Sequence, residues 1–193
     1  QFLGAFNDNL FKQLMLLLAT PTAVELAAGN AVDRQSQAMI VFAAAFLIFS
    51  GYAGFVSDRV SKRPVIIWSK VAEIGAMLLG MIGFLMYGTI GFGGMLVVLF
   101  LMGVQSAFFG PSKYGILPET IRPADLPRAN GIFLMLTFLA IIFGMALAGG
   151  LLQALGNERV WIASMVCVGI AIVGTLTSLL VRRVPPANPQ MQA

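Results

Sequence analysis

Six long apolar stretches, separated by short polar breaks, account for most of this chain. Each is close to the roughly 20 helical residues that cross a bilayer core about 30 Å thick. They are apolar on nearly every side, so the 3.6-residue period of a soluble amphipathic helix does not apply, and they lack the alternating polarity of barrel strands. The pattern predicts an all-α polytopic membrane protein with helices at about 1–23, 37–57, 65–87, 91–110, 129–154 and 160–181.

The breaks differ in length and composition. The third, Tyr87–Gly94, is rich in glycine and predicts a hairpin between antiparallel helices. The fourth, about 111–128, contains four prolines, and we expect them to prevent one long helix there. This long break divides the six helices into two groups of three, the arrangement of an inverted repeat.

We expect residues 1–184 to form a six-helix bundle and residues 185–193, which are rich in proline and polar side chains, to form a linker. In the fifth stretch Ala140, Gly144 and Ala148 recur every four positions, which predicts close packing against another helix. The first residue, Gln1, already lies in an apolar stretch, which indicates a fragment rather than a signal peptide.

Charged residues make up only 10% of the 193 residues, far below the roughly 25% typical of a soluble domain. The net charge of +4 is unevenly distributed. Breaks one and five hold only Arg34 and Arg159, whereas the even-numbered breaks and the C-terminus hold Arg59, Lys62, Arg63, Lys113, Arg122, Arg128, Arg182 and Arg183. This positive-inside distribution places the even-numbered breaks and the C-terminus in the cytoplasm and explains the basic balance without a nucleic-acid partner.

The residue types needed for catalysis or metal binding are scarce. The sequence has no histidine, and its one cysteine, Cys167, lies within an apolar stretch. No glycine loop leads into the Lys-Ser/Thr pair that cradles a nucleotide phosphate. We therefore expect no enzyme, no cofactor and no metal site within these residues.

The second break carries a spaced pattern of glycine, acid and base. Gly54 precedes Asp58 by four residues, and Arg59, Lys62 and Arg63 follow. The glycine permits a neighbouring helix to approach, and a charge cluster at a helix end can latch helices in one conformational state. Ordinary positive-inside charge is the alternative explanation.

This spacing resembles the loop between the second and third helices of the major facilitator superfamily, Gly-x-x-x-Asp-Arg-x-Gly-Arg-Arg/Lys. Ser61 stands where that pattern has its second glycine. Two further stretches, Gln1–Lys12 and Ser106–Glu119, resemble the bacterial lysophospholipid transporter branch. The resemblance covers nearly all of the chain but only the N-terminal half of a twelve-helix protein.

The resemblance implies a secondary transporter, working by alternating access, that moves lysophospholipid (chiefly lysophosphatidylethanolamine) across the bacterial inner membrane for re-acylation. It implies a lipid substrate, bilayer lipids and the other six-helix half as partners, and an acyltransferase that is either fused or separate. Two alternatives stay open: proton-coupled export of a small solute or drug, and a membrane anchor for a fused acyltransferase that transports nothing itself.

Polar side chains within the apolar stretches are the candidate substrate contacts, because each buried charge costs about 2.5–3.5 kcal/mol on insertion scales. We expect a zwitterionic head group to meet Asp8 and Lys12, together with Asn7, Gln105 and Lys113. Asp8 and Lys12 lie four residues apart on one helix face, so a self-satisfied pair is the alternative.

Two further charges, Lys70 and Glu73, lie three residues apart in the third stretch. A structural ion pair and a role in binding substrate or protons are equally good interpretations of this spacing. Ser106 is a further candidate hydrogen-bonding residue, and Glu25 is expected at the outer membrane interface.

Overall fold

The computed structural model describes residues 2–20, 27, 34–181 and 185, which form helices and no strands. The predictions for Glu25 and for residues 186–193 lie outside the described residues. Two short 3-10 turns, η1 (Pro123–Asp125) and η2 (Asn157–Arg159), precede the last two helices. The helices are α1 (Phe2–Leu18), α3 (Arg34–Arg59), α4 (Lys62–Leu85), α5 (Tyr87–Thr120), α6 (Leu126–Leu155) and α7 (Val160–Ser178). The all-α prediction is confirmed.

The helices from α3 to α7 are all long and apolar enough to cross a membrane. The helix α1 has 17 residues, which rise roughly 26 Å, and it packs on α6 and α7. The chain is therefore a multi-pass membrane protein.

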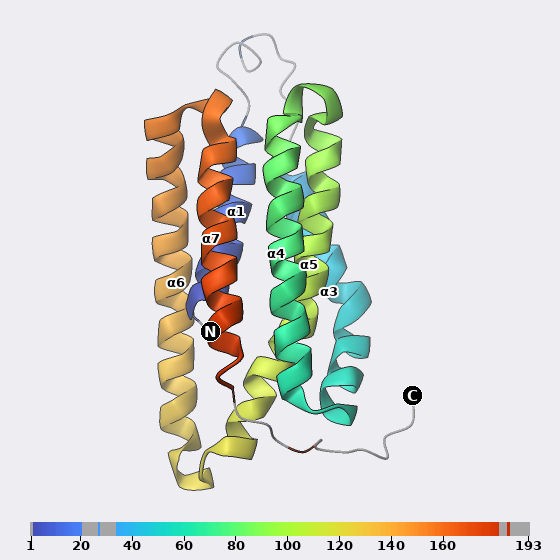
Figure 1. The fold of residues 1–193 in the computed structure, drawn as a ribbon, viewed down its shortest axis with the longest axis vertical. Helices are drawn as coiled ribbons and strands as arrows, with labels where there is room; N and C mark the ends of the chain where they lie inside the picture. The colour runs from blue at the N-terminus through green and yellow to red at the C-terminus, as the bar shows by residue number, and fades with distance from the viewer. Residues whose placement is uncertain (1, 21–26, 28–33, 182–184, 186–193) are drawn as a thin grey trace.

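The helices run alternately up and down and form two groups (Figure 1). In one group α1 packs on α6 and α7, in the other α5 packs on α3 and α4, and α4 packs along α7 to join the groups. The first helix of each half of the sequence thus packs with the last two helices of the other half. This exchange is the arrangement that an inverted repeat of three plus three helices predicts.

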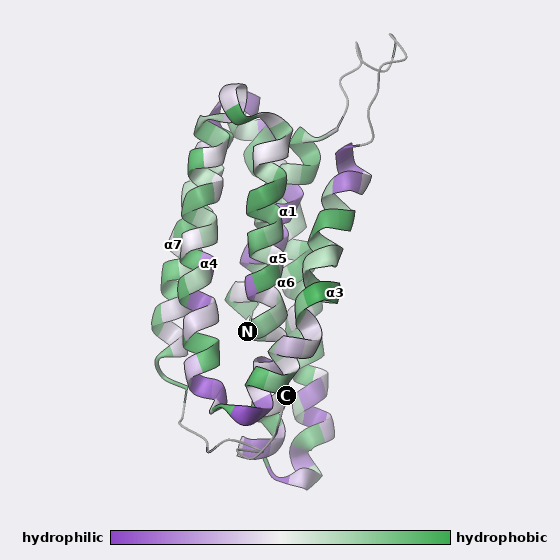
Figure 2. Cartoon of the chain, turned by 90° about the vertical axis from the view of Figure 1, so that its right-hand side faces the viewer, coloured by the Kyte–Doolittle hydropathy of each residue, from purple (hydrophilic) through white to green (hydrophobic). Residues whose placement is uncertain are grey.

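Hydrophobic residues make up most of the length of the helices, and hydrophilic residues gather toward the ends of the bundle (Figure 2). The break between α3 and α4 lies at the same end as the break between α5 and α6 (Figure 1). The bundle therefore brings the two basic breaks of the sequence together at one end, as the alternation of the six stretches predicts.

The prediction that prolines end the fourth helix near residue 110 is wrong. Pro111 and Pro118 lie inside α5, which continues to Thr120. The last turns of α5 bend toward the start of α6 (Figure 1). A proline removes one helical hydrogen bond, whereas ending the helix in an apolar setting would leave several backbone groups unpaired. Pro123 begins η1, and Pro127 lies in the first turn of α6, where no intrahelical N–H donor is required.

The predicted glycine hairpin at Tyr87–Gly94 lies where the chain reverses between α4 and α5. α4 ends at Leu85, and the helical turn that begins at Tyr87 is separated from the rest of α5 at Gly91, whose φ of 61° and ψ of −166° are not helical. Glycine adopts this positive φ without the steric cost that a side chain brings.

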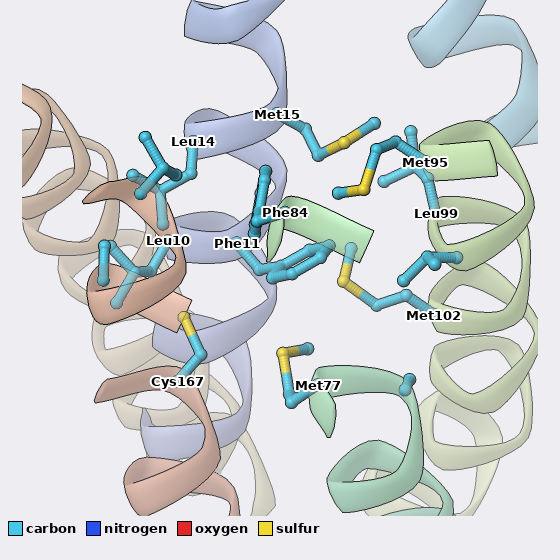
Figure 3. Packing of buried hydrophobic residues seen from close by; sticks show 14 of the residues in the cluster. Leu10, Phe11, Leu14, Met15, Met77, Phe84, Met95, Leu99, Met102 and Cys167 are labelled. Carbon is cyan, nitrogen blue, oxygen red and sulfur yellow. The ribbon is translucent and has the colours of Figure 1, made fainter. Parts of the chain in front are cut away.

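The hydrophobic core is centred on α1. Its residues Leu10, Phe11, Leu14 and Met15 are almost completely buried and face side chains from α4, α5 and α7 (Figure 3). The ring of Phe11 lies 5.6 Å from that of Phe84, centroid to centroid. Because these side chains contact α4 and α5 as well as α7, α1 is held in place by contacts with both groups of the bundle.

Close helix contacts depend on particular glycines. A side chain at Gly144 would place its Cβ only 2.7 Å from the carbonyl oxygen of Phe6, so α6 and α1 touch backbone to backbone. Ala140 and Ala148 on the same stripe are fully buried, which agrees with the packing predicted for them. A Cβ at Gly54, in contrast, would meet nothing within 4 Å, so no helix in the described residues makes the close approach predicted there.

Candidate functional site

The polar side chains predicted as substrate contacts come together where α1, α4 and α5 meet. α1 contributes Asn7, Asp8 and Lys12, and α4 contributes Lys70 and Glu73. α5 contributes Gln105, Ser106 and Lys113. Contacts between residues almost one hundred positions apart therefore decide what each of these groups can bind.

Asp8 joins α1 to α5. Its carboxylate accepts a hydrogen bond from Ser106 Oγ at 2.7 Å and one from Gln105 Nε2 at 3.2 Å. Gln105 also donates to the Ser106 hydroxyl oxygen at 2.8 Å, so the three side chains form one network. Asp8 stays half-buried in this network, whereas Gln105 and Ser106 are buried.

Lys12 does not form the ion pair with Asp8 that the four-residue spacing allows. In the described part of the chain, no carboxylate lies within ion-pair distance of its ammonium group. The Nζ atom instead lies 5.3 Å from the centroid of the Phe42 ring, on α3. An ammonium over an aromatic face is stabilised by the ring quadrupole but keeps its charge available to an anion.

Lys70 and Glu73 form an ion pair in the interior, with 4% and 2% of their surface exposed. Asn7 Nδ2 donates a hydrogen bond of 2.8 Å to Glu73 Oε1, so this amide, predicted to bind substrate, holds the pair from α1. Lys70 Nζ also lies 4.8 Å from the centroid of the Phe109 ring. A Cβ at Gly4 would overlap Lys70 Nζ, so the glycine leaves room for the ammonium group.

Lys113 is half-buried and has no carboxylate at ion-pair distance among the described residues. Its ammonium group lies 5.6 Å from the centroid of the Phe109 ring and 4.8 Å from that of Tyr114. Lys70 and Lys113 therefore share the Phe109 ring. Both also line a cavity of about 230 Å³ that reaches the hydroxyl-bearing Thr177 and Ser178 of α7.

The charged break between α3 and α4 is tied to the ends of two other helices. Lys62 forms an ion pair with Glu119 at the end of α5. Arg63 Nη2 donates a 3.0 Å hydrogen bond to the carbonyl oxygen of Leu179, beyond the end of α7. Arg59 lies over the Phe55 ring at 5.7 Å. The three bases of the Gly54–Arg63 pattern, which was predicted to act as a conformational gate, thus make separate contacts and do not pair with Asp58.

Sequence reasoning missed the aromatic contacts of the lysines and the partner of Lys62. Phe109 precedes Lys113 by four residues on one helix face, a spacing that signals a ring-to-ammonium contact. Nothing in the spacing of Lys62 and Glu119, 57 residues apart, signals their pairing. Among the described residues no group of three or more Cys, Asp or Glu side chains is placed to hold a metal ion.

The sequence model of the Major Facilitator Superfamily matches residues 2–192 of this chain. The lysophospholipid transporter LplT of Serratia proteamaculans (strain 568) is 30% identical over 191 residues, which cover 98% of this chain and 43% of that protein. LplT of Escherichia coli O1:K1 / APEC is 32% identical over 181 residues, which cover 91% and 40%. LplT of Klebsiella pneumoniae (strain 342) is 31% identical over 191 residues, which cover 98% and 43%. The chain spans about two fifths of the length of these curated relatives.

Proposed function

This chain belongs to the Major Facilitator Superfamily, and we propose that it is the N-terminal six-helix half of a secondary transporter that carries lysophospholipid across the bacterial inner membrane. The relatives that it resembles along almost its whole length are lysophospholipid transporters. In this proposal the basic end of the bundle faces the cytoplasm, as the positive-inside rule predicts. An acyltransferase, fused or separate, would use the delivered lipid.

The observation that carries the proposal is the pattern of unused charge at the site. Asp8 offers a carboxylate that is only half-buried, and Lys12 and Lys113 offer ammonium groups without a carboxylate partner in the described residues. The head group of lysophosphatidylethanolamine carries both an ammonium and a phosphate. We assign the ammonium of the head group to Asp8 and its phosphate to one of these two ammonium groups, that of Lys12 or that of Lys113, because each charge in a bilayer interior requires an opposite one.

The break between α3 and α4 would control the opening of the transport path. Lys62 is held by Glu119 and Arg63 by the carbonyl of Leu179, so the start of α4 is tied to the ends of α5 and α7. A Cβ at Gly54 would meet nothing within 4 Å, and Asp58 is exposed and has no ion pair among the described residues, so in this proposal both are free to contact the second half. Alternating access would make and break contacts at this surface.

The buried Glu73 supports one competing function, proton-coupled export of a small solute. A carboxylate that is 2% exposed inside a membrane is a possible proton carrier. Its ion pair with Lys70 and its hydrogen bond from Asn7 argue for a structural role, since both contacts fix the carboxylate between α1 and α4. The two functions differ in whether transport of lysophospholipid responds to a proton gradient.

The test is uptake of labelled lysophosphatidylethanolamine by membranes that contain the complete gene product. Asp8→Ala is expected to lower uptake by roughly tenfold to a hundredfold, because a hydrogen bond to a charged group contributes about 1.5–3 kcal/mol. Asn9→Ala is the matched control, since within the described residues the Asn9 amide bonds to Ala5 O of its own helix, at 2.7 Å. Undiminished uptake by a properly inserted Asp8→Ala protein would refute the site, and no uptake by the unmodified protein would refute the function and favour a membrane anchor.

A further inference from the structure

A long apolar groove runs along the outside of the bundle between α3 and α4. These two helices both pack extensively on α5 but scarcely touch each other, and α5 is visible between them in Figure 2. The groove has a volume of about 750 Å³. Of the side chains that line it, only Ser69 and Gln105 are polar. An apolar groove between membrane-spanning helices is suited to contact with the hydrocarbon of a bilayer.

The length of the groove matches one leaflet. Its wall on α4 extends from Pro64, at the basic end of the bundle, to Leu79. At 1.5 Å per residue this stretch rises roughly 22 Å. One leaflet contributes about 15 Å of a 30 Å hydrocarbon core, and the rest of the roughly 22 Å groove wall reaches the head-group region. A lipid acyl chain that enters from the basic end therefore fills the groove along most of its length.

The basic end of the groove continues into a second cavity of about 560 Å³ that is lined by Arg63. The two cavities share Pro64 and Trp68. Trp68 is 73% exposed, and tryptophan is enriched at the level of the lipid head groups. Arg63 Nε is buried without a hydrogen-bond partner among the described residues, although Nη2 bonds to Leu179 O.

Charge at this end favours an anionic head group. Lys62 is paired with Glu119, and the formal charges of Asp58 and Arg59 cancel although the two side chains do not form an ion pair. Arg63 has no carboxylate at ion-pair distance in the part of the chain that is described, so it supplies the unbalanced positive charge. A basic side chain near the membrane surface attracts anionic lipids.

We propose that this groove holds one acyl chain of an anionic diacyl phospholipid of the surrounding bilayer, with its phosphate at Arg63 and Trp68 at the boundary between head group and chain. This lipid is distinct from the transported substrate. The groove is separated from Asp8 by Gln105, which lines the groove and donates a hydrogen bond to the Asp8 carboxylate. A bound lipid would therefore press on the side chain that orients the proposed substrate site.

The test uses the complete gene product in nanodiscs of phosphatidylcholine and phosphatidylglycerol, with a photoreactive group on an acyl chain of the phosphatidylglycerol. Mass spectrometry of the cross-linked peptides is expected to find label concentrated on residues 68–79 and 101–108. Gly75→Trp is expected to lower this label severalfold, because Gly75 lines the groove and a side chain there meets nothing within 4 Å. Gly169→Trp, at an equally open glycine on α7, is the matched control and should leave it unchanged.

Arg63→Gln tests the head group separately and does not depend on the fit of a large side chain. It is expected to lower the preference for the phosphatidylglycerol probe over a phosphatidylcholine probe about fivefold, in line with one basic side chain at the membrane surface. Label spread evenly over the groove and the exposed face of α7 would overturn the proposal. Absence of label because another part of the gene product covers the groove would also overturn it. Complete displacement of the phosphatidylglycerol probe by trace lysophosphatidylethanolamine would overturn it too, because the groove would then belong to the substrate.

Discussion

Lys70 differs from Lys12 and Lys113 in how its charge is stabilised within the same bundle. Lys70 has a carboxylate partner, and both members of this pair are almost fully buried. Lys12 and Lys113 are half-buried and rest on aromatic rings, with no carboxylate at ion-pair distance in the described residues. An ionised group in a membrane needs an opposite charge. Glu73 supplies that charge for Lys70, whereas Lys12 and Lys113 can still bind an anion. The difference separates a pair that stabilises the fold from charges available to a ligand.

The largest effect is expected from breaking the complete pair. Glu73→Ala leaves Lys70 buried without its carboxylate, and loss of one partner of a buried pair costs about 3–5 kcal/mol. We expect a corresponding fall in the free energy of unfolding, measured by steric trapping in bicelles. The double variant Lys70→Met/Glu73→Leu replaces both charges with apolar groups and is expected to regain most of that stability. An unchanged free energy of unfolding in Glu73→Ala would show that the pair does not stabilise the fold.

An intermediate effect is expected at the ion pair that closes the basic end. The Lys62 side chain is 3% exposed and that of Glu119 is 17% exposed, so water reaches this pair more readily than Lys70 and Glu73. Glu119→Ala is therefore expected to cost less, about 1–3 kcal/mol, by the same measurement. The charge swap Lys62→Glu/Glu119→Lys keeps the pair and should recover much of the loss. A swap that behaves no better than Glu119→Ala would contradict direct pairing.

The smallest effect on stability is expected at the lysine that has no carboxylate partner. Lys113→Met removes a charge that contacts only aromatic rings, and the loss of such contacts costs about 0.5–1 kcal/mol. Its effect on function is expected to be larger: the KM for lysophosphatidylethanolamine should rise about tenfold if a charge-assisted contact to phosphate is lost. Lys113→Arg, which keeps the charge, is the control. A loss of stability as large as that of Glu73→Ala, with an unchanged KM, would make Lys113 a structural residue.

Most of the fold was predictable because the membrane imposes a simple rule on length and polarity. The predicted stretch 37–57 corresponds to α3 and 160–181 to α7 within a few residues. The main error concerns where the fourth helix ends, since proline ends helices readily in water but less readily in a bilayer. Pro111 remains inside α5, whereas Gly91 interrupts the helix within the predicted hairpin.

The candidate site was less predictable than the fold. The spacing of Lys70 and Glu73 allowed their ion pair, because residues three apart on a helix are neighbours. The same kind of rule suggested a pair between Asp8 and Lys12, yet Asp8 bonds to Gln105 and Ser106 on α5. Asn7, a predicted substrate contact, donates a hydrogen bond to Glu73 on α4. Spacing along one helix indicates which contacts are possible, but the neighbouring helix decides which of them form.

The sequence by itself determined that this protein is a bundle of membrane-spanning helices with its basic breaks at one end. Apolar length and charge distribution carry that information directly, because lipid excludes unpaired backbone groups and charges. Only the tertiary structure decided which buried charges are neutralised, which remain available to a ligand, and that α3 and α4 diverge to leave a groove. These properties depend on the rotation and separation of whole helices, which are fixed by close contacts such as that of Gly144 with the backbone of α1.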